Sequence, residues 1–111
     1  MTDPLLKRLE YLSSGDQAFQ LELIQLFLEE SEKNLAEVEQ HMTAGDLTKA
    51  AQATHAIKGA ALNVGAKSLS QTSASLETLL EQGGNDHHLL QELLATFQRV
   101  KEKLEAHLKT L

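Results

Sequence analysis

Hydrophobic residues recur along this chain at alternating steps of three and four residues, the spacing of one face of an α-helix. The longest such pattern falls in a segment from about residue 16 to residue 44. Its stripe is apolar apart from one serine and consists of Ile24, Leu28, Ser31, Leu35, Val38 and Met42. The pattern therefore predicts a long amphipathic helix whose stripe faces a core.

Four further segments are predicted to be helical: about Pro4 to Ser13, Leu47 to Val64, Lys67 to Gln82, and Asn85 or Asp86 to Lys109. Asp3-Pro4 supplies a capping side chain and a proline at the first helical position, and Gly15, Gly45 and Gly65 mark helix ends. Each of the last three helices has its own stripe of expected core-facing positions. In the helix from Leu47 these are Leu47, Ala50, Thr54, Ile57, Ala61 and Val64, and in the helix from Lys67 they are Leu69, Thr72, Leu76, Leu79 and Leu80. In the last helix they are Leu90, Leu93, Leu94, Phe97, Val100, Leu104 and Leu108.

Four substantial helices joined by short turns favour antiparallel packing of neighbours. The expected fold class is all-α: an up-down-up-down antiparallel four-helix bundle with a short additional N-terminal helix. No internal repeat, low-complexity segment or linker divides the sequence, so residues 1–111 are expected to form a single domain. Met1 and a complete bundle favour a free-standing protein over part of a larger kinase.

Composition narrows the class of protein. The chain has 111 residues, no cysteine, one proline and a net charge of −6. Without cysteine it has neither a disulfide framework nor a thiolate metal site, and its acidic balance argues against nucleic acid as a partner. No apolar run approaches the roughly 18 residues of a membrane span, and the first residues lack the basic and apolar regions of a signal peptide. A cytoplasmic protein is expected.

The most informative chemistry lies in the segment around His55. His55, Lys58 and Gly59 share one helix face because residues at i, i+3 and i+4 are neighbours. This face lies beside the predicted core stripe, so His55 is expected at the margin of the bundle. A neutral imidazole is a nucleophile near neutral pH, since an unperturbed histidine titrates at about 6.5. A cation favours an incoming phosphoryl group and a missing side chain clears its approach, so the combination suggests a histidine that carries a phosphoryl group.

This segment resembles the signature of the histidine-containing phosphotransfer (HPt) domain family: a histidine, two residues, Lys-Gly, small residues and a glycine. Here it reads Thr54-His55-Ala56-Ile57-Lys58-Gly59-Ala60-Ala61-Leu62-Asn63-Val64-Gly65-Ala66. The likeness continues to Leu69 and Leu76-Glu77 downstream and to the acidic amphipathic helix upstream, so it covers most of the chain.

The resemblance implies that His55 attacks an aspartyl phosphate presented by a receiver domain and that the protein passes the phosphoryl group to another receiver. Lys58 would stabilise the phosphoryl group. Glu77 would lie close to His55 on the adjacent helix and orient its ring, although a solvated glutamate is an alternative. The protein would be a phosphoryl carrier and not an enzyme, because the receiver would supply most of the catalysis.

Other residues of the motif are expected to shape the surface. Gly59 would give the partner steric access, and close packing of helices is the competing explanation for this helix-interior glycine. Ala51 and Leu62 lie near His55 on the side leading to solvent and are expected to contact the partner. Gly65 is expected to be structural, as a helix terminus or as a close contact with the next helix.

The expected partners are response-regulator receiver domains, a hybrid sensor histidine kinase, or both, with the protein itself a monomer. No cofactor or metal is expected in this chain; Mg²⁺ would belong to the receiver. The remaining histidines are predicted to be surface residues, and none has the spacing of a di-metal bundle: His41, His87, His88 and His107.

Two other functions remain open. The first is the dimerisation helix pair of a sensor histidine kinase. The sequence motif of such helices is a histidine followed directly by an acidic residue and, a few positions later, by a proline. Here Ala56 follows His55 and the only proline is Pro4. The second is a non-catalytic helical adaptor that binds a receiver without exchanging phosphate, but such an adaptor has no need of His55 or Lys58.

Overall fold

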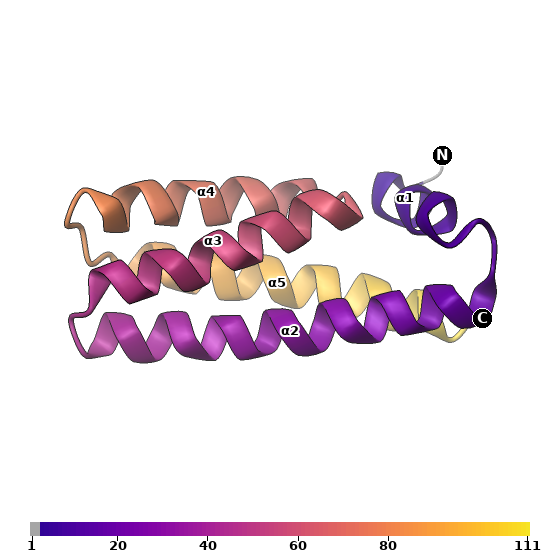
Figure 1. The fold of residues 1–111 in the computed structure, drawn as a ribbon, viewed down its shortest axis with the longest axis horizontal. Helices are drawn as coiled ribbons and strands as arrows, with labels where there is room; N and C mark the ends of the chain where they lie inside the picture. Colours follow the sequence, from indigo (N-terminus) through magenta and orange to yellow (C-terminus); the bar gives the residue numbers. More distant parts are fainter. Residues whose placement is uncertain (1–2) are drawn as a thin grey trace.

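The computed structural model describes residues 3–111, and this part of the chain consists of five α-helices with short turns between them and contains no strand (Figure 1). The helices are α1 (Pro4–Ser13), α2 (Gln17–Thr43), α3 (Leu47–Val64), α4 (Lys67–Glu81) and α5 (His87–Leu108). The all-α fold class predicted from the sequence is confirmed, and the helix boundaries fall within a residue or two of those expected.

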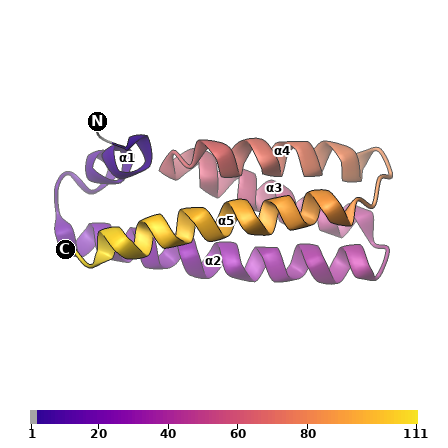
Figure 2. The same cartoon turned by 180° about the vertical axis from the view of Figure 1, so that it is seen from behind.

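Helices α2 to α5 form an up-down-up-down bundle in which each helix runs antiparallel to the one before it (Figures 1 and 2). In both views α2 and α5 are the longer pair and extend past the ends of α3 and α4. The short α1 lies beyond these ends, over the exposed part of the longer pair. The bundle therefore has one end formed by turns alone and one end covered by α1.

Aspartates fix the starts of four helices. Their side-chain oxygens accept hydrogen bonds from backbone N–H groups two or three residues further on, within the first turn of each helix, at distances of 2.9–3.1 Å: Asp3, Asp16, Asp46 and Asp86. A cap of this kind stabilises a helix by about 1 kcal/mol. Ala66, the residue before α4, makes no side-chain cap and directly follows Gly65, which ends α3.

The predicted stripe of α2 is buried along its whole length, and those of α3 and α5 are mostly buried. The prediction for α4 is partly wrong. Thr72 and Leu79 are only half-buried, while Ser70 and Ser73 are buried in their place. Small serines suit this face because α3 and α4 make the most extensive contact in the bundle, and close approach of two helices needs small side chains.

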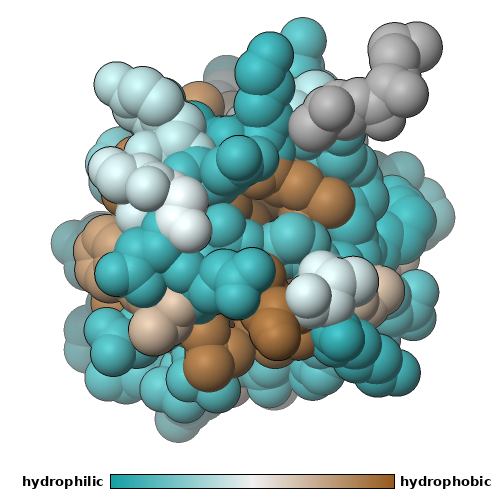
Figure 3. Space-filling view, turned by 90° about the vertical axis from the view of Figure 1, so that its right-hand side faces the viewer, coloured by the Kyte–Doolittle hydropathy of each residue, from teal (hydrophilic) through white to brown (hydrophobic). Residues whose placement is uncertain are grey.

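Helix α1 is attached through both apolar and polar contacts. Leu5 and Leu9 are buried in the core. Nζ of Lys103, on α5, lies 2.7 Å from the Asp3 carboxylate. Seen from the end that α1 covers, the surface is mostly hydrophilic with small hydrophobic areas between (Figure 3). The helix therefore shields apolar side chains that the longer helices would otherwise leave in water.

A partly buried polar contact near α1 corrects the prediction that His107 is a surface residue. His107 is half-buried on α5, and its Nε2 is hydrogen-bonded to Oε1 of the buried Gln20. The amide of Gln20 also donates to Oγ of Ser13 at 3.2 Å. These contacts join the end of α1, the start of α2 and the end of α5.

None of the described helices combines the length and apolar character needed to cross a membrane.

Candidate functional site

His55 lies on the outer surface of α3, where its side chain is 64% exposed. The position follows from the helix pattern. Thr54 and Ile57 are fully buried and mark the core-facing side of α3, and His55 lies about 100° further round the helix from Thr54, on the side away from Ile57. The ring therefore stands at the margin of the bundle, as the sequence predicts.

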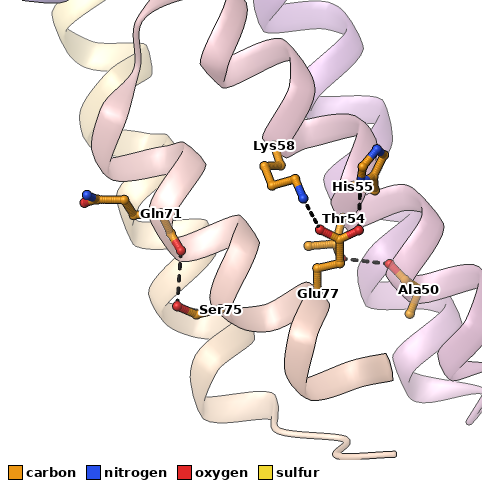
Figure 4. Close-up of polar contacts among 7 residues, drawn as sticks. All are labelled: Ala50, Thr54, His55, Lys58, Gln71, Ser75 and Glu77. Atoms are coloured by element: carbon orange, nitrogen blue, oxygen red, sulfur yellow. Dashed lines mark hydrogen bonds and ion pairs between the residues drawn. The ribbon is translucent and has the colours of Figure 1, made fainter. Parts of the chain in front are cut away.

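Glu77 reaches this histidine from α4 and joins it to Lys58 (Figure 4). Nδ1 of His55 lies 2.7 Å from Oε2 of Glu77, and Nζ of Lys58 donates to Oε1 at 2.6 Å. The two helices meet side by side, so residues separated by about twenty positions in the sequence share one site. The alternative that Glu77 is a solvated residue is wrong, because its side chain is only 13% exposed.

The Glu77 carboxyl is ionised at neutral pH. Burial acts to raise its pKa, but the hydrogen bonds from Lys58 and His55 and the charges of these groups outweigh burial and hold the pKa below the ordinary value of 4.5. An ionised carboxylate can only accept hydrogen bonds. Nδ1 of His55 must therefore carry the hydrogen in this contact, and in the neutral ring the lone pair is then on Nε2.

Nε2 is the ring nitrogen free to react. Among residues 3–111 it has no hydrogen-bond partner, and the ring around it is largely exposed. Fixing the tautomer through the other nitrogen is a common way to present an imidazole nitrogen to a ligand or reactant. The geometry thus offers one unblocked nucleophilic nitrogen to an incoming electrophile.

Gly59 lies one turn after His55 on the same face of α3. A Cβ atom built at this position would meet nothing within 4 Å. Close packing of helices therefore does not explain this glycine. A glycine inside a helix costs about 1 kcal/mol relative to alanine, and what it leaves here is open surface beside the histidine.

Ala51 and Leu62 lie on either side of His55 along α3, but their environments differ. Leu62 is 61% exposed, as expected of a partner contact. Ala51 is only 9% exposed, so the prediction that it lies on the solvent side is wrong. It lines a groove between α3 and α4 that begins at His55, which we call the His55 groove. Its other lining residues are Leu47, Thr48, Gln52, Glu77, Leu80 and Glu81.

Gly65 is structural. Its backbone has φ of +80°, a conformation that favours glycine, and it ends α3. A Cβ here would lie 3.2 Å from Cβ of Arg8, so the close contact is with α1 and not with α4. Nε of Arg8 donates to the carbonyl oxygen of Asn63 at 3.2 Å. This arginine was not identified from the sequence, because nothing local links residues so far apart.

Gln52 and Glu81 were also not singled out from the sequence. A signal for each exists: Gln52 precedes His55 by three residues and Glu81 follows Glu77 by four, so each shares a helix face with a site residue.

Among the described residues, no three His, Cys, Asp or Glu side chains are grouped in a way that could hold a metal ion. The absence of a cofactor remains a prediction.

The model of the Hpt domain family matches residues 22–110, which is most of the chain. The protein therefore belongs to the Hpt domain family, and the resemblance found in the sequence is confirmed. Hpt domains act in phosphotransfer in two-component signalling, as carriers of phosphoryl groups rather than as catalysts, and they interact with receiver domains or histidine kinases. Comparison with curated proteins and with solved structures gives no significant match.

Proposed function

We propose that this Hpt domain accepts a phosphoryl group on Nε2 of His55 from the phosphorylated aspartate of one receiver domain and returns it to the aspartate of another. The observation that carries the proposal is the exposed His55 ring whose Nδ1 is bound to a nearly buried carboxylate. This contact leaves one nitrogen with a free lone pair facing solvent.

The transfer balances without an external acid or base. The lone pair on Nε2 forms a bond to phosphorus while the bond from phosphorus to the aspartate oxygen breaks, and the aspartate leaves as a carboxylate. Because the hydrogen stays on Nδ1, the phosphorylated ring carries a positive charge. Glu77 faces that charge at 2.7 Å and stabilises it as it develops. Return transfer reverses these bond changes.

Lys58 supplies the positive charge that the phosphoryl group requires from this chain. Its Nζ is held by Glu77 and its side chain is 27% exposed, so it can turn towards solvent one helical turn from the ring. Gly59 leaves the approach to His55 open. We expect Mg²⁺ to be bound by the receiver's own acidic residues, where it offsets further phosphoryl charge.

The direct test is transfer of labelled phosphate from a phosphorylated receiver to the variant His55→Gln. The variant should take no label while remaining folded. His88→Gln is the matched control, since His88 is exposed on α5 and outside the site, and it should behave as wild type. If His55→Gln takes label as well as the parent protein does, the proposal is wrong.

The same variants separate this function from the alternatives. An adaptor that binds a receiver without exchange would keep its affinity and its signalling output after His55→Gln. A separate incubation of wild type with ATP alone tests the histidine kinase alternative: the carrier proposed here should take no label, and autophosphorylation would favour the kinase.

The surface that meets the receiver should be small, because transient signalling contacts often bury under about 1,200 Å² in total. We propose that Leu62 is part of its apolar centre, since this leucine lies two turns from His55 on the same face and is largely exposed. Leu62→Ala should slow transfer through weaker binding of the receiver. Unchanged rates would exclude Leu62 from the contact.

A further inference from the structure

The His55 groove combines an apolar lining with carboxylates, and the phosphoryl transfer does not explain this combination. It lies between α3 and α4 and has a volume of about 520 Å³. Leu47, Ala51 and Leu80 give it an apolar lining, and carboxylates of Glu77 and Glu81 stand on the α4 side. A groove of this size is large enough to receive a side chain from a docked protein.

The His55 groove carries one negative charge that no neighbouring group of the described chain neutralises. Glu77 is neutralised by Lys58. Glu81 is exposed and forms no ion pair with any residue of the described chain. It is also the last residue of α4, where the end of the helix carries a negative partial charge. The positive end of α3 nearby is offset by the Asp46 cap, so the uncompensated charge is that of Glu81.

We propose that the His55 groove receives a long basic side chain, arginine or lysine, from the receiver domain that docks on His55. The aliphatic part would lie along Leu47, Ala51 and Leu80, and the cationic head would pair with Glu81. This inference rests on the proposed function and names a feature of its partner. The groove is continuous with His55, so a receiver positioned for transfer covers both.

Other occupants fit the groove less well. An acidic side chain would be repelled by Glu81 and by a chain whose net charge is −6. An apolar side chain would fill the floor but would remove water from Glu81 without giving it a partner. A basic residue satisfies both the apolar lining and the charge. Glu81 would then help to select among receivers, since one lacking the basic residue would dock less well.

The test compares phosphotransfer by wild type, Glu81→Gln and Glu81→Lys, with the receiver that exchanges fastest with wild type. Glu81→Gln should lower the second-order rate constant by about two- to fivefold, the effect expected for a partly exposed ion pair. Glu81→Lys should lower it further, by about tenfold, because attraction becomes repulsion. Both losses should shrink at high salt.

A matched control separates a local contact from a general effect of charge. Glu105 is exposed on α5 and outside the groove, so Glu105→Lys makes the same change in net charge and should leave the rate near that of wild type. Each lysine and arginine near the receiver's aspartate is then replaced by alanine. One of these receiver variants should abolish the difference between wild type and Glu81→Gln.

The outcomes are distinguishable. If wild type exchanges phosphate with receivers but the Glu81 variants match the Glu105 control, this inference is wrong and the proposed function stands. The inference is also wrong if no basic residue of the receiver is coupled to Glu81, which would point to an apolar occupant. If no receiver labels wild type, the proposed function and this inference both fail.

Discussion

Removing the Glu77 carboxylate should slow phosphotransfer without removing the nucleophile. The variant Glu77→Ala loses both contacts of the carboxylate, to Nδ1 of His55 and to Nζ of Lys58. The variant Glu77→Gln keeps one acceptor oxygen, but its NH₂ group accepts from neither partner. We therefore expect both variants to transfer more slowly than wild type and alanine to be the slower of the two.

The size of the effect follows from the exposure of the two groups. A hydrogen bond to a charged group contributes about 1.5–3 kcal/mol when well shielded. Here the carboxylate is 13% exposed and the imidazole is 64% exposed, so solvent reduces the value to about 1–2 kcal/mol. Because about 1.36 kcal/mol corresponds to tenfold in rate, the rate constant should fall by about 5- to 30-fold.

Rapid-quench measurement of label transfer from a phosphorylated receiver gives the rate constant, and nitrogen-15 NMR of the imidazole reports which ring nitrogen carries the hydrogen. Wild type should show hydrogen on Nδ1, and the Glu77 variants should lose this preference. Glu105→Gln is the control for a change of charge on an exposed helix face. A folded Glu77→Ala that transfers within twofold of wild type would refute the reasoning.

Three further predictions concern stability and access. Gly59→Ala should raise the free energy of unfolding in urea by up to about 1 kcal/mol, because a Cβ there meets nothing, whereas Gly59→Leu should fold normally and slow transfer by covering the approach to His55. Ser73→Ala should stabilise the protein by about 1 kcal/mol in thermal unfolding, since the buried Ser73 hydroxyl has no hydrogen-bond partner; a loss of stability would contradict this. Because the folded-state pKa of Glu77 is below the ordinary 4.5, its ionised form stabilises the fold above that pH. The difference in free energy of unfolding between wild type and Glu77→Gln should therefore be largest above about pH 4.5 and should vanish as the pH falls through the lowered pKa. A difference that grows as the pH falls would contradict this prediction.

The helices were predictable because their signals are local. Asp3, Asp16, Asp46 and Asp86 each stand one residue before a helix and cap it with their side chains, and the cap at Asp3 was predicted from the sequence. Glycines end the helices where expected, and the stripe of α2 is continuous. The exposed position of His55 followed from the same periodicity, since it depends only on which residues of α3 face inward.

What the sequence did not predict depends on contacts between helices. Serines on α4 are buried because α3 approaches closely, whereas the pattern alone favoured Thr72 and Leu79. Ala51 is only 9% exposed because it lies between the same two helices, in the His55 groove and not on the outer surface of α3. The contact of His107 with Gln20 joins residues 87 positions apart, and no local pattern encodes such a pairing.

The most direct measurement is to locate the phosphoryl group after incubation with a phosphorylated receiver. Phosphorus-31 and nitrogen-15 NMR of the labelled protein identify the residue and the ring nitrogen that carry it. The phosphoryl group should be on Nε2 of His55, with hydrogen retained on Nδ1 facing Glu77. Label on Nδ1, on another residue, or on no residue at all would contradict the role assigned to this histidine.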